Sequence, residues 1–168
     1  MILKAEELVI VPYTDQYLED YYREFTGEIT RYQFAEPFGS PEAAGEYLDA
    51  QCGQMGQGDM LLLVILSDTG EFLGSAEVYG LKETFPEIGI WLKRAAQGRG
   101  YAFRALTCLM QYLNDVYHKE AYLYEADIRN GASLRLAKKF RYQDCGVETH
   151  HMESGKELFL QTFRIQVP

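Results

Sequence analysis

Residues 87–102 read EIGIWLKRAAQGRGYA, and this stretch decides the fold of the chain. Glu87–Leu92 has the pattern of a strand, and a strongly amphipathic helix is predicted over Gly98–Tyr117. The first turn of a helix has N–H groups without internal partners and the positive end of the helix dipole, and glycines let a ligand approach the backbone. The junction therefore predicts an anion site suited to a diphosphate, with Arg99 as an added cationic donor; the alternative is an ordinary tight turn.

A second strand-to-helix junction follows about thirty residues later. A strand is predicted over Ala121–Ile128, and Asn130-Gly131-Ala132-Ser133 begins a shorter helix. Asn130 has two interpretations: it caps the helix, or its amide also pairs with an amide-bearing ligand. Basic residues crowd around this helix and would lie near the glycine-rich junction if the two strands are neighbours; they are Arg129, Arg135, Lys138, Lys139 and Arg141.

Outside these junctions the chain alternates helices and strands, which is typical of a mixed α+β fold. Five further strands and the two early helices complete the pattern. Strands are predicted at Leu8–Val11, Met60–Leu66 and Glu71–Tyr79, then near Tyr142–Glu148 and Glu157–Ile165. Thr14 is expected to cap a helix through Phe25, and Ser40-Pro41-Glu42 to start another that ends among Gly53, Gly56 and Gly58.

Length and composition limit the classes of protein that remain. The 168 residues fit one domain, residues 1–168. The longest apolar run, Met60–Leu66, is too short to cross a membrane, and the first residues lack the apolar stretch of a signal peptide. Three cysteines without a CxxC pair argue against a disulfide framework or a zinc site, so a reducing, cytoplasmic location and no metal are expected.

The charge is divided unevenly along the chain. The net charge of −9 disfavours nucleic-acid binding. Residues 1–84 contain 16 acidic and 4 basic side chains, whereas residues 85–168 contain 9 acidic and 12 basic ones. A basic half suits a compact polyanion and an acidic half suits a cation, although an uneven solvated surface is an equally good explanation of charge alone.

Taken together, the two junctions resemble a known family. Gln97-x-x-Gly100-x-Ala102 resembles the acetyl-CoA motif of the GNAT N-acetyltransferases, and Asn130-x-x-Ser133-x-x-Leu136 is similar to their second signature. The sequence from Glu87 to Ala102, and Ser133 after Asn130, are most similar to the RimJ/RimL branch of this family. The resemblance implies a twisted mixed sheet of about six to seven strands, splayed in the middle and flanked by about four helices.

The resemblance also implies acetyl-CoA as cosubstrate and assigns residues to it. The backbone of Ile90, Trp91 and Leu92 would pair with the pantetheine arm. The other assigned residues are Gln97, Gly98, Arg99, Gly100, Tyr101, Ala102, Asn130, Ser133 and Lys138. Three positions depart from the family: Arg141-Tyr142 replaces the usual Gly-Phe, and Ala137 stands where many members have a tyrosine acid.

The implied reaction is direct attack of an amine on the thioester, without a metal. Glu87, at the start of its strand, is the first candidate for the base; Glu125 and Glu77 are the others. Ser133 is the candidate acid in the absence of the tyrosine. Three of them also have a structural interpretation: Glu87 as a solvated strand-end carboxylate, Glu125 as a cross-strand partner for a basic residue, and Ser133 as a helix-turn hydroxyl. Tyr32, Phe34 and Glu77 are assigned to the acceptor site, and His150-His151 to a surface loop.

Three functions are therefore distinguished. The first is an N-acetyltransferase acting on a protein N-terminal α-amine or a small cationic amine, as a monomer or homodimer, without nucleic acid or membrane as partner. The second is a non-catalytic acyl-CoA-binding sensor or interaction module of the same fold. The third is a binder of another phosphate ligand, such as a nucleotide. Binding and turnover of acetyl-CoA separate the three.

Overall fold

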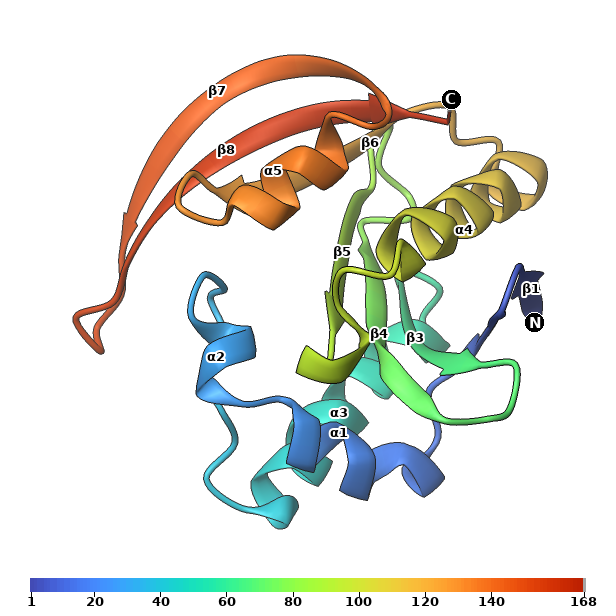
Figure 1. Cartoon of the computed structure of the whole chain (residues 1–168), viewed down its shortest axis with the longest axis vertical. Helices are drawn as coiled ribbons and strands as arrows, with labels where there is room; N and C mark the ends of the chain where they lie inside the picture. Colours follow the sequence, from blue (N-terminus) through green and yellow to red (C-terminus); the bar gives the residue numbers. More distant parts are fainter. Residues whose placement is uncertain (168) are drawn as a thin grey trace.

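A twisted eight-stranded sheet with helices on both faces makes up the computed structural model, which describes residues 1–167 (Figure 1). The strands are β1 (Leu3–Ala5), β2 (Leu8–Pro12), β3 (Met60–Ser67), β4 (Phe72–Tyr79), β5 (Glu87–Leu92), β6 (Tyr122–Asp127), β7 (Arg141–His151) and β8 (Glu157–Gln166). The helices are α1 (Leu18–Glu24), α2 (Gly27–Thr30), α3 (Pro41–Gly56), α4 (Tyr101–Tyr117) and α5 (Gly131–Ala137), with 3-10 turns η1 (Asp15–Tyr17) and η2 (Arg94–Ala96).

The sheet is nearly divided at its centre. Its strand order is β1-β2-β3-β4-β5-β6-β8-β7, and every neighbouring pair is antiparallel except β5 and β6. That parallel pair has one registered position, Glu87 opposite Leu123. Beyond it the two strands diverge, so within residues 1–167 the later part of β5 has a strand partner only on its β4 side.

Two apolar clusters cover the two faces of the sheet. One joins α4 and α5 to the sheet and includes Leu106, Leu109 and Phe163. The other lies under α1 and α3 and contains Tyr21 and Trp91. Strand β3 is buried along its whole length because it contributes to both clusters, as its continuous apolar sequence predicted.

Local sequence explains where the long helices begin and end. The Ser40 hydroxyl accepts a hydrogen bond from the Ala43 N–H at 3.1 Å, and Pro41 occupies the first turn of α3. Helix α4 buries one stripe of apolar side chains against the sheet and ends at His118, which has a left-handed backbone conformation with φ of 54°. Both helices match their predicted spacing.

The mixed α+β prediction is confirmed, with differences in detail. The sheet has eight strands instead of six to seven, and there are five α-helices instead of four. The unexpected elements, β1 and α2, have three and four residues, too few to show a periodicity. The helix expected after Thr14 divides into η1 and α1, and the Thr14 side chain makes no capping hydrogen bond.

Two smaller differences concern the ends of elements. Helix α4 begins at Tyr101 rather than Gly98, because Gly98 and Gly100 have positive φ values that a helix does not allow. Strand β7 extends to His151, beyond the expected end at Glu148. Within residues 1–167, no helix is both long enough and apolar enough to cross a membrane.

Candidate active site

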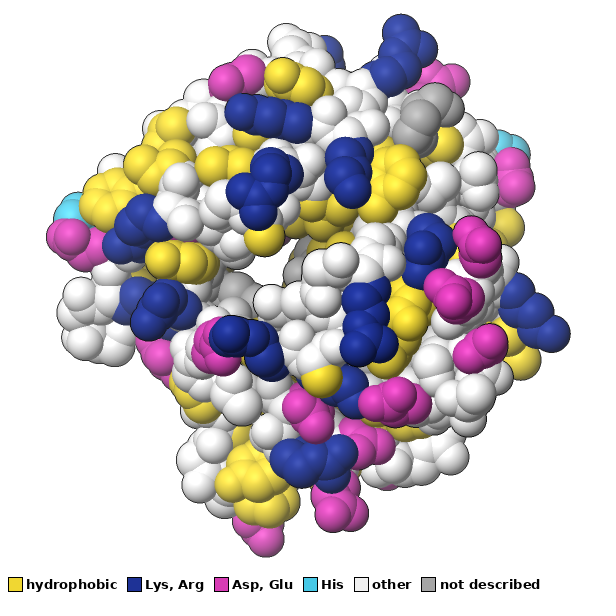
Figure 2. Space-filling view, viewed as in Figure 1, with side chains coloured by type: hydrophobic (Ala, Val, Ile, Leu, Met, Phe, Trp, Pro, Cys, Tyr) yellow, Lys and Arg dark blue, Asp and Glu magenta, His cyan; other side chains and the backbone are white. Residues whose placement is uncertain are grey.

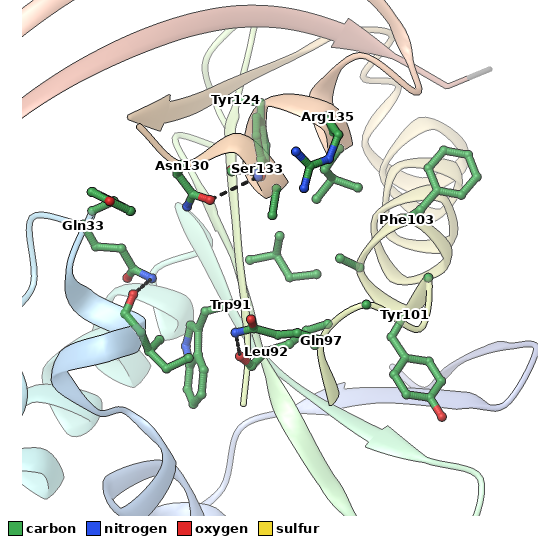
Figure 3. Close-up of a pocket in the computed structure, with 18 of the residues that line it drawn as sticks. Gln33, Trp91, Leu92, Gln97, Tyr101, Phe103, Tyr124, Asn130, Ser133 and Arg135 are labelled. Carbon is green, nitrogen blue, oxygen red and sulfur yellow. Dashed lines mark hydrogen bonds between the residues drawn. The ribbon is translucent and has the colours of Figure 1, made fainter. Parts of the chain in front are cut away.

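A cleft of about 500 Å³ opens where β5 and β6 diverge (Figure 3). Its walls come from β5, the start of α4, the start of α5 and the segment that contains α2. Figure 3 shows Trp91 and Leu92 on one side and Asn130, Ser133 and Arg135 on the other. Segments more than 100 residues apart therefore meet at one site.

The exposed edge of β5 forms the floor of this cleft. Backbone groups alternate in direction along a strand, and Lys93 donates to the Leu73 carbonyl on the β4 side. The N–H and C=O of Ile90 and Leu92 therefore face the gap. The Leu92 carbonyl accepts a hydrogen bond from the Gln97 amide at 3.0 Å, as Figure 3 shows, whereas the Ile90 groups have no strand partner in the described part of the chain.

The start of α4 presents backbone donors to the cleft. Gly98 and Gly100 have φ values of 75° and 77°, and Gly100 provides no side chain to cap the helix. The first backbone donor with an acceptor in this stretch is the Arg104 N–H, which bonds the Gly100 carbonyl at 3.2 Å. The N–H groups of residues 98–103 have no acceptor within residues 1–167 and could bind an anion, and Gly98, Gly100, Tyr101 and Ala102 all line the cleft.

Basic side chains gather around the cleft, but not all of those predicted. Figure 2 shows Lys and Arg side chains around a hollow at the centre of this face. Arg135 and Lys139 line the cleft, and the Lys139 ammonium lies 5.5 Å from the centre of the Phe103 ring. Arg99 and Lys138 are not among the residues that line the cleft, so their predicted contact with the cosubstrate stays a prediction.

The start of α5 differs because a side chain already occupies its backbone donor. The Asn130 Oδ1 atom accepts from the Ser133 N–H at 3.2 Å, so the capping interpretation of Asn130 is confirmed. Asn130 also lines the cleft, and its Nδ2 group makes no hydrogen bond to another residue within 1–167. The second interpretation, a hydrogen bond to a ligand, therefore stays a prediction.

A tyrosine that the sequence did not indicate lies beside Ser133. The Tyr124 and Ser133 hydroxyl oxygens are 2.6 Å apart, and both residues line the cleft. Burial raises the pKa of Tyr124 to about 12, although the hydrogen bond with Ser133 lowers it. Only the alternation of β6 could have suggested this residue, since the side chain of Tyr124 lies on the same face of the sheet as those of its buried neighbours Tyr122 and Ala126.

Glu77 lies behind the cleft wall, on the face of the sheet covered by α1 and α3. Its Oε1 atom accepts from the Tyr21 hydroxyl at 3.3 Å and lies 2.8 Å from the Ser75 hydroxyl. Tyr21 in turn accepts from the indole N–H of Trp91 at 3.3 Å, which connects Glu77 to a cleft-lining residue. Burial raises the pKa of Glu77 to about 7, and the hydrogen bonds from Ser75 and Tyr21 lower it.

Glu87 and Glu125 lie on the same face of the sheet as Glu77 but do not line the cleft. Glu87 is at the exposed start of β5; partial desolvation and the nearby Glu125 charge raise its pKa. Glu125 accepts a hydrogen bond from the Thr162 hydroxyl at 3.1 Å, so it does have a cross-strand partner, but not the basic residue that its structural interpretation expects.

The predicted acceptor-site aromatics separate in the structure. Tyr32 lines the cleft, and the Arg129 guanidinium lies 5.2 Å from the centre of its ring. Phe34 does not line the cleft; it is exposed and packs edge-on against His150 with ring centres 5.1 Å apart. Residues 1–167 contain no cluster of His, Cys, Asp or Glu side chains suited to a metal ion.

Comparison with known proteins places this geometry in context. A family model described as an acetyltransferase (GNAT) domain matches residues 7–143. No curated protein matches the sequence at the required significance. Among solved structures, the chain is similar to the ribosomal-protein α-N-acetyltransferase RimL in complex with coenzyme A, with a TM-score of 0.88, 14% identity and coverage of 99% of this chain and 98% of that one.

Two further structures share the fold. Spermidine N-acetyltransferase from Vibrio cholerae, in complex with CoA and spermine, has a TM-score of 0.83 at 14% identity, with 96% of each chain covered. An acetyltransferase from Salmonella typhimurium that modifies the N-terminal serine of a ribosomal protein has a TM-score of 0.85 at 13% identity, with 100% of this chain and 99% of that chain covered. At these identities the likeness shows a common fold.

Proposed function

The chain belongs to the acetyltransferase (GNAT) family, and we propose that it acetylates a primary amine that is positively charged in solution. As a member of this family it is an N-acetyltransferase with acetyl-CoA as cosubstrate. All described strands belong to one sheet, which supports a single acetyltransferase domain over residues 1–168. The acceptor and the roles of individual residues form the proposal developed below.

The residues around the cleft fit acetyl-CoA. The free N–H groups at the start of α4 suit a diphosphate, and the open edge around Ile90 suits the amides of a pantetheine arm. The Nδ2 group of Asn130 is a further donor on the opposite wall. Lys139 and Arg135 would supply positive charge for the phosphate on the adenosine part of acetyl-CoA. Backbone donors without an acceptor at the start of α4, beside a strand edge that has no partner within residues 1–167, are the observation that carries the proposal.

The acceptor amine must lose a proton before it can attack. A lysine-type amine with a pKa of ~10.4 costs roughly 4–5 kcal/mol to deprotonate at pH 7, whereas an α-amine with a pKa near ~8 costs only about 1 kcal/mol. A base with a pKa near neutral suits both, because it is partly ionised at the working pH and still accepts a proton readily.

We propose Glu77 rather than Glu87 as the group that takes this proton. A Cβ on Gly89 would lie 3.4 Å from the Glu77 Oε2 atom, so the absence of a side chain there leaves space beside β5 for an amine or a bridging water. Its pKa of about 7 is near the working pH. The Ser75 hydroxyl also contacts the Leu63 carbonyl at 2.8 Å and has one proton to donate, so Glu77 can itself donate to Ser75 when protonated.

Ser133 and Tyr124 form the proposed acid on the opposite wall. Acetyl-CoA, when bound, supplies a thioester-activated acetyl group whose sulfur leaves as a thiolate. Ser133 lines the cleft and can donate its hydroxyl proton, and Tyr124, 2.6 Å away, can replace it. The pKa of Tyr124, about 12, keeps that tyrosine protonated at neutral pH. This pair takes the place of the family tyrosine that is Ala137 here.

The charge on the acceptor side supports a cationic amine. Glu77, Glu87 and Glu125 share one face of the sheet, and the acidic half of the chain builds the helices that cover it. The similar structures include an enzyme for a protein N-terminus and one for spermidine, both of which present a cation. Within this class we propose either a basic protein N-terminus or a small polyamine, and the acetylation assay distinguishes them.

Calorimetry followed by a turnover assay tests this function. We expect acetyl-CoA and CoA to bind and ATP to bind much more weakly. Release of free thiol is then measured with spermidine, an aminoglycoside and a peptide that has a basic N-terminal sequence. Turnover with at least one amine is expected. Binding of acetyl-CoA without turnover of any amine would contradict catalysis, and absence of binding would contradict the cosubstrate site.

A further inference from the structure

Lys156 makes an unusual set of contacts from the turn between β7 and β8. Its Nζ atom lies 3.2 Å from the Thr30 carbonyl oxygen, 3.0 Å from that of Gln33 and 2.9 Å from that of Ala35. It also pairs with the Glu36 Oε1 atom at 2.8 Å, and 16% of the lysine side chain is exposed. Four oxygens of one short segment therefore surround a single ammonium group.

An ammonium group has three N–H donors and accepts nothing, so these oxygens replace most of its water. The three carbonyls lie more than 120 residues from Lys156 in sequence, and the segment between Thr30 and Glu36 is otherwise irregular. Two aromatic contacts also involve this segment: Phe34 packs against His150 of β7, and the Tyr32 ring lies beside the Arg129 guanidinium. The ammonium group is the part that satisfies several carbonyls at once.

The segment that Lys156 holds is one wall of the cleft. Its residues in the lining are Glu28, Ile29, Arg31, Tyr32 and Gln33. Figure 3 shows Gln33 across the cleft from Asn130 and Ser133, with its amide bonded to the Ile29 carbonyl at 3.1 Å. Figure 1 shows α2 below the β7–β8 hairpin and away from the sheet. The position of this wall therefore depends on the hairpin as well as on α1 and α3.

We propose that Lys156 is a positioning residue that fixes residues 28–36 to the β7–β8 turn and thereby sets the opening through which the acceptor reaches the cleft. This rests on the proposed function, because residues 28–36 lie opposite the proposed acid. Lys156 touches neither the cleft nor the reacting atoms; it acts through the wall that it holds. The backbone donors proposed for acetyl-CoA lie at the start of α4, outside residues 28–36, so we expect the loss of the Lys156 contacts to change acetyl-CoA binding little.

The test compares Lys156→Met with Lys119→Met. Methionine keeps much of the apolar stem and removes the ammonium group. Lys119 is a matched control, since it also donates to a backbone carbonyl, that of Glu83 at 2.6 Å, but lies outside the cleft. The first readout is the rate at which trypsin cleaves after Arg31, an exposed residue within the clasped segment, followed by mass spectrometry under native conditions.

We expect Lys156→Met to accelerate cleavage after Arg31 by about tenfold, as the loss of charged hydrogen bonds implies, and Lys119→Met to leave the rate unchanged. The KM for the acceptor should rise by about tenfold in Lys156→Met, while the KM for acetyl-CoA stays within about twofold of the wild-type value. Lys156→Arg, which keeps a cationic donor, should recover part of both effects.

Unchanged cleavage after Arg31 would overturn the clasp. Faster cleavage with an unchanged acceptor KM would overturn its role in acceptor access. If Lys156→Met does not fold, Glu36→Gln, which weakens one of the four contacts, should give the same changes at smaller size, and no change there would overturn the proposal. If the wild-type chain acetylates no amine, the proposed function fails, whereas the proteolysis still decides whether the clasp exists.

Discussion

The two walls of the cleft have the same secondary structure but present different chemical groups. Each is a strand followed by a helix, β5 to α4 and β6 to α5. At α4 the capping position is Gly100, so the first N–H groups remain free. At α5 it is Asn130, whose own oxygen bonds the Ser133 N–H, so what faces the cleft is the Ser133 side chain. One wall therefore offers backbone groups to the cleft, and the other offers side chains.

The difference shows that a strand-to-helix junction does not by itself create an anion site. The capping position must also lack a side-chain acceptor, because a side-chain oxygen there occupies a backbone donor that an anion needs. The same contrast extends to the acceptor face, where Glu77 is held by side chains from β4 and α1. Backbone recognition should therefore be sensitive to any added side chain, and side-chain recognition to the loss of single atoms.

The largest effect is expected from Gly100→Glu. The new side chain would strain a backbone with φ of 77° and place a carboxylate among donors that suit a diphosphate. We expect the affinity for acetyl-CoA, measured by calorimetry, to fall by more than about 100-fold. Gly58→Glu is the control, since Gly58 has φ of 72° with open space around it and lies outside the cleft. Equal losses in both variants would contradict backbone recognition.

The next effect is expected from Glu77→Gln, which removes a proton acceptor and keeps the shape of the side chain. For the wild-type chain, kcat/KM should rise with pH through about 7, the pKa of Glu77. In the variant this acidic limb should disappear, and kcat/KM at pH 8 should be about 100-fold lower. Glu120→Gln, at an exposed position, serves as the control. A variant that retains the acidic limb would exclude Glu77 as the base.

The same substitution should change the pH dependence of stability. Burial raises the pKa of Glu77 from its ordinary value of 4.5 to about 7, so the folded chain binds this proton more tightly than the unfolded chain does. The resulting contribution to the free energy of unfolding is complete below pH 4.5 and is lost as the pH rises through about 7. Relative to wild type, the free energy of unfolding of Glu77→Gln should therefore increase by about 2–3 kcal/mol between pH 5 and pH 8. Urea unfolding at the two pH values measures this difference.

A smaller effect is expected at the Ser133 wall. Tyr124→Phe removes one hydroxyl, and we expect kcat to fall about tenfold while the KM for acetyl-CoA changes less than about twofold. Ser133→Ala should have a similar effect. If the two hydroxyls act as a pair, the double variant should lose no more than the larger single loss. Fully additive losses in kcat would show that the hydroxyls act separately.

The smallest effects separate the two roles of Asn130. Asn130→Ala should lower the free energy of unfolding by about 1 kcal/mol because the α5 cap is lost. Asn130→Ser keeps a capping oxygen but removes the amide donor, so stability should be preserved while the affinity for acetyl-CoA falls about threefold to tenfold. Unchanged affinity in Asn130→Ser would leave Asn130 with its capping role alone.

The sequence predicted the backbone-built wall well because its parts are contiguous. Gly98, Gly100, Tyr101 and Ala102 lie in one run, and the free donors of a helix start are a local property. The buried strand β3 and the Ser40-Pro41 helix start were equally local and were confirmed. Sequence could not separate Lys138 from Lys139, because both follow the end of α5 at Ala137 and only Lys139 lines the cleft within the described residues.

The side-chain-built parts depend on contacts between distant segments. Tyr124 and Ser133 meet only once α5 folds back on β6, and Tyr21 reaches Glu77 across 56 residues. Glu77 was the third candidate for the base, because its burial and its place beside Gly89 follow from the pairing of β4 with β5. Lys156 gave no signal, since a lone lysine in a turn is ordinary until its acceptors are known.

The single registered pair between β5 and β6 has a consequence for cooperative folding. Strands β1–β5 and strands β6–β8 each form a local antiparallel unit, and the boundary between the units is the cleft itself. A molecule bound there touches both units and therefore opposes their separation. A ligand that binds the folded chain raises its free energy of unfolding by mass action. At a ligand concentration of 100 times the dissociation constant, this increase is about 2.7 kcal/mol. The melting temperature of this enzyme should consequently follow the acetyl-CoA concentration, and amide exchange in β6 should slow in step.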